Sequence, residues 1–219
     1  MSNQLPTQIP TTVFHKVVKT TKGEIKWIDV TTDDLFKNKK VVIFGLPGAF
    51  TPTCSGQQLP GYEQLYSSFR EAGIDDIYCI SVNDSFVMNE WHIDQDLINV
   101  KLIPDGSAEF TIKMGMDVRK DNLGFGVRSW RYAAIYDNTF LVEEFVEAGI
   151  NDNVIGDPYE VSRPERVYEY VAKELAPEVI DELKDTMEEV AVLDDRYDSV
   201  GKQIELNFSD STSVKEKIR

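Results

Sequence analysis

Two short apolar segments, each followed by a helical pattern, constrain the fold of this 219-residue chain more than any other feature. The first, residues 39–46, is rich in β-branched side chains and is broken by Pro47-Gly48, which is typical of a buried strand entering a loop. The second, residues 76–82, has the same character. Strand, helix, strand and helix in this order predict parallel strands in a central sheet that helices flank.

The helices are predicted from the spacing of their apolar side chains. Residues 57–71 carry such a pattern and Gly73 ends it, so Cys54 is expected in the first turn of a helix. A second helix over 86–98 offers four residues for packing, Phe86, Met88, Trp91 and Ile93. Further on we expect a turn at 104–106, a short helix over 109–114, a glycine-bearing loop over 122–126, a hairpin of 131–136 and 140–146, and a final helix over 164–175. Together these elements predict a mixed α/β domain over residues 1–176.

The composition changes after this domain. Residues 177–219 contain 12 acidic and 6 basic residues, which is a net charge of −6 within a total of −15. We predict an amphipathic acidic helix over 178–193, followed by a polar and mobile tail. Residues 177–219 are therefore interpreted as an acidic, helical and flexible C-terminal extension.

Charge and cysteine content argue against several classes of function. A net charge of −15 and a pI near 4.5 would repel nucleic-acid phosphates and anionic membrane surfaces, so we expect neither as a partner. No segment approaches the roughly 20 apolar residues of a membrane span, and residues 1–10 resemble no signal or transit peptide. Two cysteines and two histidines are too few for a disulfide framework or a zinc site. We expect a cytoplasmic protein without a metal or cofactor.

Segment 47–54 combines features that thiol chemistry requires. A free cysteine has a pKa of about 8.5, and only the thiolate attacks an O–O bond, so the surroundings of Cys54 must lower its pKa. The amide groups and dipole of a helix start act in this direction. Thr51 offers a hydroxyl to the sulfur and to a bound peroxide. Pro47 adds bulk without a backbone donor, which helps to keep water away from the thiol.

Each cysteine also has a purely structural interpretation. A cysteine taken alone is more often a small buried apolar residue than a nucleophile. For Cys54, the flanking Pro47, Pro52 and Gly56 mark a loop and a helix start instead of an apolar core, which favours the reactive role. Cys79 lies within an apolar strand pattern, so we interpret it as a packing residue.

The chain resembles the peroxiredoxins, whose active-site pattern is Pro-x-x-x-Thr-x-x-Cys with a distant arginine. Residues 47–54 match this pattern, and residues 81–91 and 126–132 form two further matching blocks in the family's order. The sequence Pro-Gly-Ala-Phe-Thr-Pro-Thr-Cys-Ser, followed by Leu-Pro-Gly-Tyr, is similar to the peroxiredoxin 5-like subfamily in particular. The resemblance spans about residues 9–175 and implies a thioredoxin-like fold.

The resemblance also implies roles for individual residues. Those that it assigns to catalysis are Cys54, Thr51, Arg131 and Pro47. Those that it places around the substrate are Thr53, Phe50 and Arg128, with the amides of Thr53 and Cys54 as donors to the peroxide. An exposed surface charge is the usual position of an arginine. Arg131 precedes an apolar run, which favours an inward position, and Arg128 is expected to support the site.

Two departures from the family pattern bear on the mechanism. Gln58 stands where relatives often carry a histidine, which leaves the expected catalytic set intact. No cysteine follows Cys79, whereas some relatives have a resolving cysteine near the C-terminus. Residues 156–162 resemble bacterial forms fused to a glutaredoxin domain, but no Cys-Pro-x-Cys follows residue 175. We therefore expect a one-cysteine cycle.

The implied function is reduction of hydrogen peroxide and organic hydroperoxides through a sulfenic acid on Cys54. Glutathione, glutaredoxin or thioredoxin would recycle the enzyme, and a homodimer with Phe50 near the contact is expected. A thiol–disulfide exchange protein is the first alternative, although Thr51 occupies the partner position of its usual Cys-x-x-Cys motif. A non-catalytic redox sensor whose acidic extension binds a partner is the second.

Overall fold

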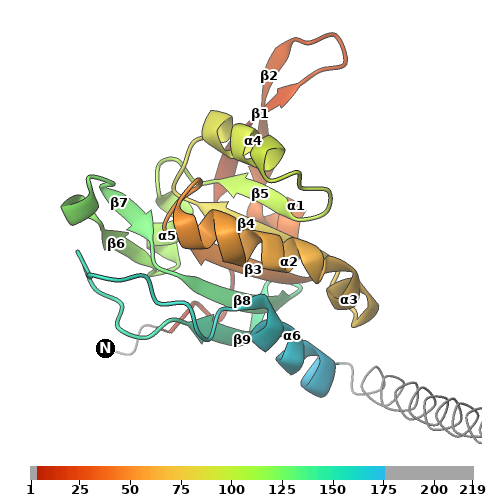
Figure 1. Cartoon of the computed structure of the whole chain (residues 1–219). Coiled ribbons are helices and arrows are strands. Elements are labelled where there is room, and N and C mark those ends of the chain that lie inside the picture. Colours follow the sequence, from red (N-terminus) through yellow and green to blue (C-terminus); the bar gives the residue numbers. More distant parts are fainter. Residues whose placement is uncertain (1–3, 176–219) are drawn as a thin grey trace, which may run out of the picture. The chain divides into compact units, whose positions relative to one another are not determined.

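A five-stranded mixed sheet forms the centre of the structure, a computed structural model that describes residues 4–175 (Figure 1). The strand order is β5-β4-β3-β8-β9. The parallel strands are β3 (Lys40–Leu46), β4 (Asp76–Ser81) and β5 (Lys101–Pro104). The predicted hairpin is formed by β8 (Tyr132–Asp137) and β9 (Phe140–Val146), and β8 pairs antiparallel with β3. The predicted central mixed sheet is therefore confirmed.

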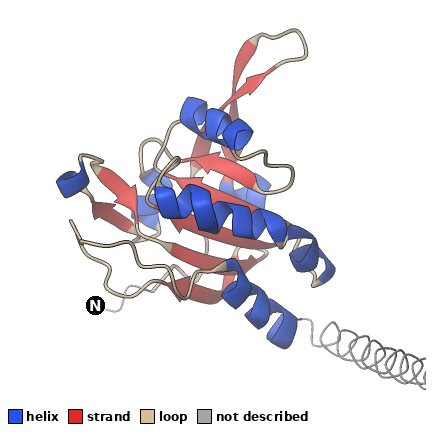
Figure 2. Cartoon of the chain, viewed as in Figure 1, coloured by secondary structure: helices blue, strands red, loops and turns tan. Residues whose placement is uncertain are grey.

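Helices cover both faces of this sheet (Figure 2). On one face, Phe36 of α1 packs in the same apolar core as Val41 of β3. Alternate residues of β3 point to the opposite face, where the ring of Phe44 stacks on Tyr62 of α2 with 4.1 Å between centroids. The helices of the first face are α1 (Thr32–Phe36) and α5 (Glu109–Lys113). The second face carries α2 (Leu59–Gln64), α3 (Tyr66–Glu71) and α6 (Pro164–Tyr170).

The helix that follows β3 begins with a wider turn than an α-helix. A π-helical turn, η1 (Cys54–Gln58), precedes α2, and the amide of Leu59 donates to the carbonyl of Cys54. Pro60 lacks the N–H that an α-helical hydrogen bond would use at this point, which accounts for the wider turn. The helix is interrupted at Leu65, where φ is −89° and ψ is 3°, and this separates α2 from α3. Cys54 lies in the first helical turn, as predicted.

The next helix, α4 (Ser85–Asp94), is shorter than the predicted helix over 86–98. The carboxylate of Asp84 caps its start by accepting from two backbone amides. The helix ends where Asp96 adopts a left-handed conformation with φ of 47°. Of the residues expected to pack, Met88 and Trp91 are buried, but Phe86 and Ile93 are exposed because they lie on the solvent side of α4.

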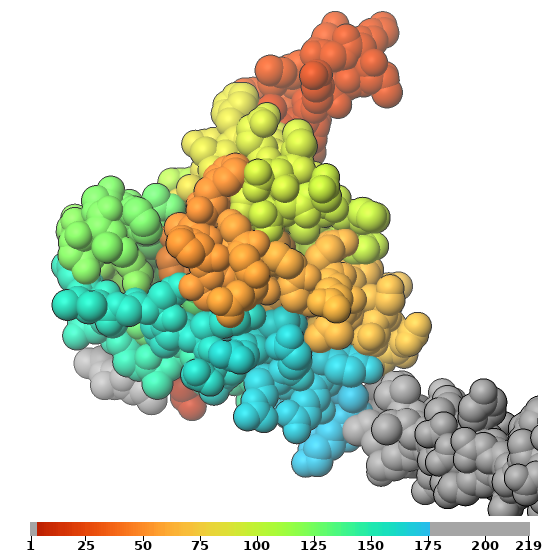
Figure 3. All heavy atoms as spheres, viewed as in Figure 1, coloured from red at the N-terminus to blue at the C-terminus, as the bar shows by residue number. Residues whose placement is uncertain are grey.

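Two antiparallel ribbons lie outside the central sheet. The first consists of β1 (Val13–Lys19) and β2 (Ile25–Thr31) and projects from the body of the domain (Figure 3). The second consists of β6 (Asp117–Arg119) and β7 (Val127–Ser129). The glycine-bearing loop predicted over 122–126 closes this second ribbon and includes part of a 3-10 turn, η2 (Asp121–Leu123).

The last described element is the predicted helix over 164–175, which is divided into α6 and a π-helical turn, η3 (Val171–Leu175). The extension predicted over 177–219 lies outside the described residues. Within residues 4–175, no helix combines the length and the apolar character that crossing a membrane requires.

Candidate active site

Cys54 lies where the loop after β3 becomes helical. Its side chain is completely buried, with an exposed fraction of 0%. Thr53 already has helical backbone angles, and the amide of Ser55 donates to the carbonyl of Thr51 at 2.9 Å. The thiol is therefore located at the amino end of the helical segment, where the helix dipole favours negative charge.

The loop between β3 and η1 is held in one conformation by polar contacts. The hydroxyl of Thr51 donates to the carbonyl of Gly48 at 2.8 Å, so its oxygen lone pairs remain able to accept. The amide of Ala49 donates to Oδ1 of Asn83 at 3.0 Å, which ties the loop to the segment after β4. A Cβ at position 48 would lie 2.9 Å from Nη1 of Arg128, so a larger residue there would displace the end of the Arg128 side chain.

Arg131 places its guanidinium against the thiol. The side chain is 1% exposed, and Nη1 donates to Sγ of Cys54 at 3.5 Å and to Oε1 of Gln58. Nη2 donates to Oδ1 of Asp157 at 2.5 Å. Burial acts to lower the pKa of Arg131, but the neighbouring Cys54 and Asp157 raise it by more, so the net shift is upward. The guanidinium therefore remains a permanent positive charge beside the sulfur.

Arg128 belongs to β7 and makes different contacts. Its Nη1 lies 3.5 Å from the carbonyl oxygen of Pro47 and 3.4 Å from Oδ1 of Asn83, and its Nε donates to the carbonyl of Phe125 at 3.2 Å. Of the two arginines, Arg131 donates to Cys54, whereas the hydrogen bonds of Arg128 go to the loop carbonyls and to Asn83. Arg128 instead links the loop after β3 to the second ribbon.

The remaining predicted site residues lie in the same loop at different depths. Pro47 is buried, and Thr53 is half-buried directly before the thiol. Phe50 has a left-handed backbone with φ of 62° and is 51% exposed. Its ring centroid lies 6.4 Å from that of Trp91, whose Nε1 donates to Oγ of Ser55 at 2.9 Å. Phe50 is therefore the part of this loop that lies at the protein surface.

Cys79 is buried in β4, as predicted, with an exposed fraction of 0%. Burial raises the pKa of its thiol well above the usual value, and the neighbouring Cys54 raises it further, while Arg131 acts in the opposite direction. The Cys79 thiol therefore stays protonated near neutral pH and is a poor nucleophile.

Comparison with known proteins identifies the family to which this arrangement belongs. The Redoxin family model matches residues 17–157. A peroxiredoxin of Rhizobium etli is 56% identical over 73% of this chain and 92% of its own length. The chain belongs to the peroxiredoxin family.

Two further relatives agree with this assignment to the peroxiredoxins. The hybrid peroxiredoxin hyPrx5 of Haemophilus influenzae is 46% identical over 78% of this chain and 68% of its own length. The crystal structure of a Plasmodium falciparum antioxidant protein, titled a 1-Cys peroxiredoxin, is 38% identical with a TM-score of 0.72, and the match covers 79% of this chain and all of that one. This peroxiredoxin therefore has the thioredoxin-like fold of its family and is an oxidoreductase, a thiol-dependent peroxidase.

Three residues that sequence reasoning left without a role surround Arg131 in this peroxiredoxin. Gln58 accepts from Nη1 with its side-chain oxygen, and Asp157 accepts from Nη2. The ring of Tyr159 lies 5.4 Å below the guanidinium carbon. Gln58 was noted only as a departure from the family pattern, and the other two lie in the segment 156–162. A buried arginine requires a carboxylate partner, and this was the one signal that could have pointed to Asp157.

Glu147 anchors the segment that carries Asp157 and Tyr159. Its carboxylate is 3% exposed, and Oε1 accepts from the amide of Glu160 at 2.8 Å. The same oxygen accepts from the amide and the hydroxyl of Ser162 at 2.9 and 2.7 Å. One buried carboxylate thus fixes the chain directly after the residues that contact Arg131.

We expect Glu147→Ala to lower the free energy of unfolding of this peroxiredoxin by about 2–4 kcal/mol, because it leaves buried donors without an acceptor. Urea unfolding measures this loss. The matched control is Glu160→Ala, which removes a carboxylate with an 80% exposed side chain and a 3.9 Å ion pair to Arg163. The control substitution should lower the free energy of unfolding by less than about 0.5 kcal/mol. Equal losses in the two variants would contradict the anchoring role.

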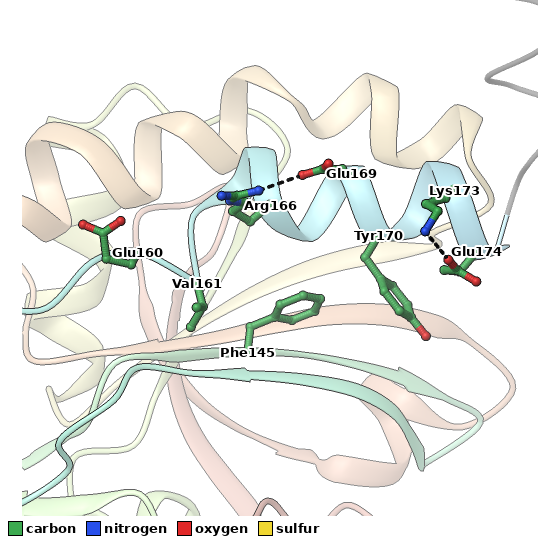
Figure 4. A pocket seen from close by; sticks show the side chains of 8 residues that line it. All are labelled: Phe145, Glu160, Val161, Arg166, Glu169, Tyr170, Lys173 and Glu174. Carbon is green, nitrogen blue, oxygen red and sulfur yellow. Dashed lines mark hydrogen bonds and ion pairs between the residues drawn. The ribbon is translucent and has the colours of Figure 1, made fainter.

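A pocket of about 420 Å³ lies away from this chemistry, between β9 and α6 (Figure 4). Phe145 and Tyr170 point toward each other across it, with their ring centroids 5.8 Å apart. The charged side chains at its rim include the pairs Arg166–Glu169 and Lys173–Glu174. None of the residues that line this pocket belongs to the site around Cys54.

Proposed function

We propose that Cys54 is the nucleophile with which this peroxiredoxin reduces hydrogen peroxide and small organic hydroperoxides. One observation carries the proposal: a completely buried thiol at a helix start lies 3.5 Å from Nη1 of the buried Arg131. A fixed positive charge at this distance favours the thiolate over the thiol.

The thiolate attacks one peroxide oxygen, the O–O bond breaks, and Cys54 becomes a sulfenic acid. The second oxygen takes up a proton and leaves as water, or as an alcohol when the substrate is an organic hydroperoxide. Arg131 and the amides of Thr53 and Cys54 stabilise the negative charge that develops on the peroxide oxygens. The hydroxyl oxygen of Thr51 accepts a hydrogen bond from the peroxide O–H.

The other predicted residues act around this centre. Pro47 is buried and excludes water from the sulfur. Arg128 supports the site through its contact with the carbonyl of Pro47. Phe50 borders the substrate side of the loop, where its exposed ring lies beside Trp91.

We propose a one-cysteine cycle for the recovery of the thiol. The raised pKa of Cys79 keeps that thiol protonated, so it does not attack the sulfenic acid on Cys54. An external thiol, such as glutathione or the thiol of a glutaredoxin or thioredoxin, forms a mixed disulfide instead, and a second thiol releases the enzyme. The resemblance to a protein titled a 1-Cys peroxiredoxin supports this cycle. The need for a thiol reductant favours a reducing compartment such as the cytoplasm.

A homodimer with Phe50 at its contact is the proposed assembly. An aromatic ring that is 51% exposed on a left-handed residue is a suitable anchor for a partner surface. We expect Phe50→Glu to convert a dimer at micromolar concentration into monomer in sedimentation velocity. The control Ile98→Glu, at an apolar residue that is 86% exposed in another loop, should remain dimeric. A wild-type protein that sediments as monomer would contradict the assembly.

Peroxide consumption by the purified protein, with and without glutathione, tests the proposed function against its alternatives. A peroxidase consumes about one equivalent of peroxide per thiol without a reductant and continues to turn over when the thiol is present. A thiol–disulfide exchange protein would reduce a disulfide substrate and leave hydrogen peroxide intact. A redox sensor would be oxidised once and would show no turnover with any thiol.

A further inference from the structure

The two arms of the Arg131 guanidinium have different partners. Nη1 is shared between Cys54 and Gln58, whereas Nη2 is held by Oδ1 of Asp157 at 2.5 Å. The Arg131 side chain is 1% exposed and that of Asp157 is 37% exposed, so this ion pair lies at the boundary between the buried site and solvent. The centroid of the Tyr159 ring lies 5.4 Å from the guanidinium carbon of Arg131.

We propose that Asp157 is a positioning residue of the peroxidase reaction, which aims the Arg131 guanidinium at Cys54 and offsets part of its positive charge there. This inference rests on the proposed role of Cys54 as the nucleophile. A positioning role for Asp157 would give the segment between β9 and α6 a part in the reaction. The other proposed steps use no residue of this segment.

The orienting effect follows from the geometry of the guanidinium. It is a rigid planar fork, so fixing Nη2 also fixes the direction of Nη1. The carboxylate of Asp157 is the partner that the structure shows for Nη2, and Nε of Arg131 is buried without a hydrogen-bond partner among residues 4–175. Without Asp157, Gln58 would be the one side-chain oxygen left to orient the guanidinium among the described residues, and the donor would be less well aligned with the reacting oxygens before the reaction starts.

The electrostatic effect follows from the charges that face the thiol. Among the described residues, Arg131 before β8 donates to Cys54, and Cys79 on β4 interacts electrostatically with it, but the raised pKa of Cys79 keeps that thiol neutral. Around Arg131 there are Asp157 and Tyr159, and burial raises the pKa of Tyr159 so that it is also neutral. The positive charge of Arg131 and the negative charge of Asp157 therefore oppose each other at the sulfur.

Asp157→Asn and Asp157→Ala separate these two effects. The asparagine keeps an oxygen acceptor for Nη2 and removes the charge, whereas the alanine removes both. Each variant is made together with Cys79→Ala, which leaves Cys54 as the single thiol. Two measurements follow: the pH titration of the Cys54 thiolate by its ultraviolet absorbance, and the rate of Cys54 oxidation by hydrogen peroxide as a function of pH.

In Asp157→Asn, both pH curves should shift to lower pH by roughly half a unit or more, because the unopposed guanidinium stabilises the thiolate. The oxidation rate at high pH should stay within about twofold of the parent, since the guanidinium keeps its direction. In Asp157→Ala the high-pH rate should fall by about tenfold or more. The control is Glu160→Gln, which removes a charge from the same segment without contact to Arg131.

Overlapping pH curves for Asp157→Asn and its parent, or an equal shift in Glu160→Gln, would overturn the positioning role. An alanine variant with the parent's high-pH rate would overturn the orienting effect. The thiolate titration needs no peroxidase activity. If the parent itself were not oxidised by peroxide, the proposed function would fail while the titration would still decide the effect of Asp157 on Cys54.

Discussion

Replacing Cys54 by serine is expected to abolish peroxide reduction, whereas Cys79→Ser should retain most of it. A serine hydroxyl at position 54 has a pKa far above that of a thiol and cannot form a sulfenic acid. No other group in the proposed mechanism can then attack the peroxide. Cys79 is buried in β4 with a raised pKa and has no proposed step. Burying a hydroxyl there should cost about 1–3 kcal/mol of stability but leave the activity of the folded protein within about twofold.

The rate of hydrogen peroxide consumption in the presence of glutathione measures this difference. Circular dichroism and urea unfolding of both variants serve as the control for folding. Comparable losses of activity in two folded variants would contradict the assignment of Cys54 as the single reactive thiol.

The second large effect is expected for Arg131→Lys, which should slow oxidation of Cys54 by about a hundredfold or more. Arg131 contacts three groups at once, Cys54, Gln58 and Asp157, through two nitrogens of one rigid plane. A lysine ammonium is a point charge with a single nitrogen and cannot reproduce this arrangement. Its placement at a site that is 1% exposed also leaves polar partners without donors.

Stopped-flow tryptophan fluorescence is suited to this measurement, because Nε1 of Trp91 donates to Oγ of Ser55, directly after Cys54. Arg128→Lys is the matched control, since Arg128 contacts the loop carbonyls and not the thiol. It should reduce the rate by less than the Arg131 variant. A normal rate in Arg131→Lys together with a slow rate in Arg128→Lys would move the proposed role to Arg128.

The sequence was informative where short-range patterns decide the structure. The apolar run of β3, broken by Pro47, placed Cys54 at a helix start, and the structure has it in the first turn of η1. The apolar run after Arg131 predicted an inward position for that arginine, and it is 1% exposed. In both cases neighbouring residues along the chain carry the signal for position, whereas the resemblance to the peroxiredoxins implied the catalytic roles.

The partners of Arg131 could not be predicted because they meet only in the tertiary structure. Gln58 lies 73 residues from Arg131 along the chain, and Asp157 lies 26 residues away on the other side. Neither has a local pattern that distinguishes it from a surface residue. Their role depends on the burial of one guanidinium, which is a property of the fold and not of any segment.

The second strand of the first ribbon, β2, was not predicted for a different reason. Most residues of β2 are exposed, including Ile25 and Trp27, so its apolar side chains do not alternate between core and solvent. The alternation that identifies a half-buried strand is therefore absent. The ring of Trp27 instead packs against Phe86 with 5.8 Å between centroids, on the exposed side of α4.

Mass spectrometry of the protein after one equivalent of hydrogen peroxide tests the central claim most directly. The proposed cycle predicts one added oxygen on the peptide that contains Cys54, an unmodified Cys79 peptide, and a glutathione adduct on Cys54 when that thiol is supplied. An intramolecular disulfide between Cys54 and Cys79 that forms as fast as peroxide is consumed, or a Cys54 peptide that peroxide leaves unchanged, would contradict it.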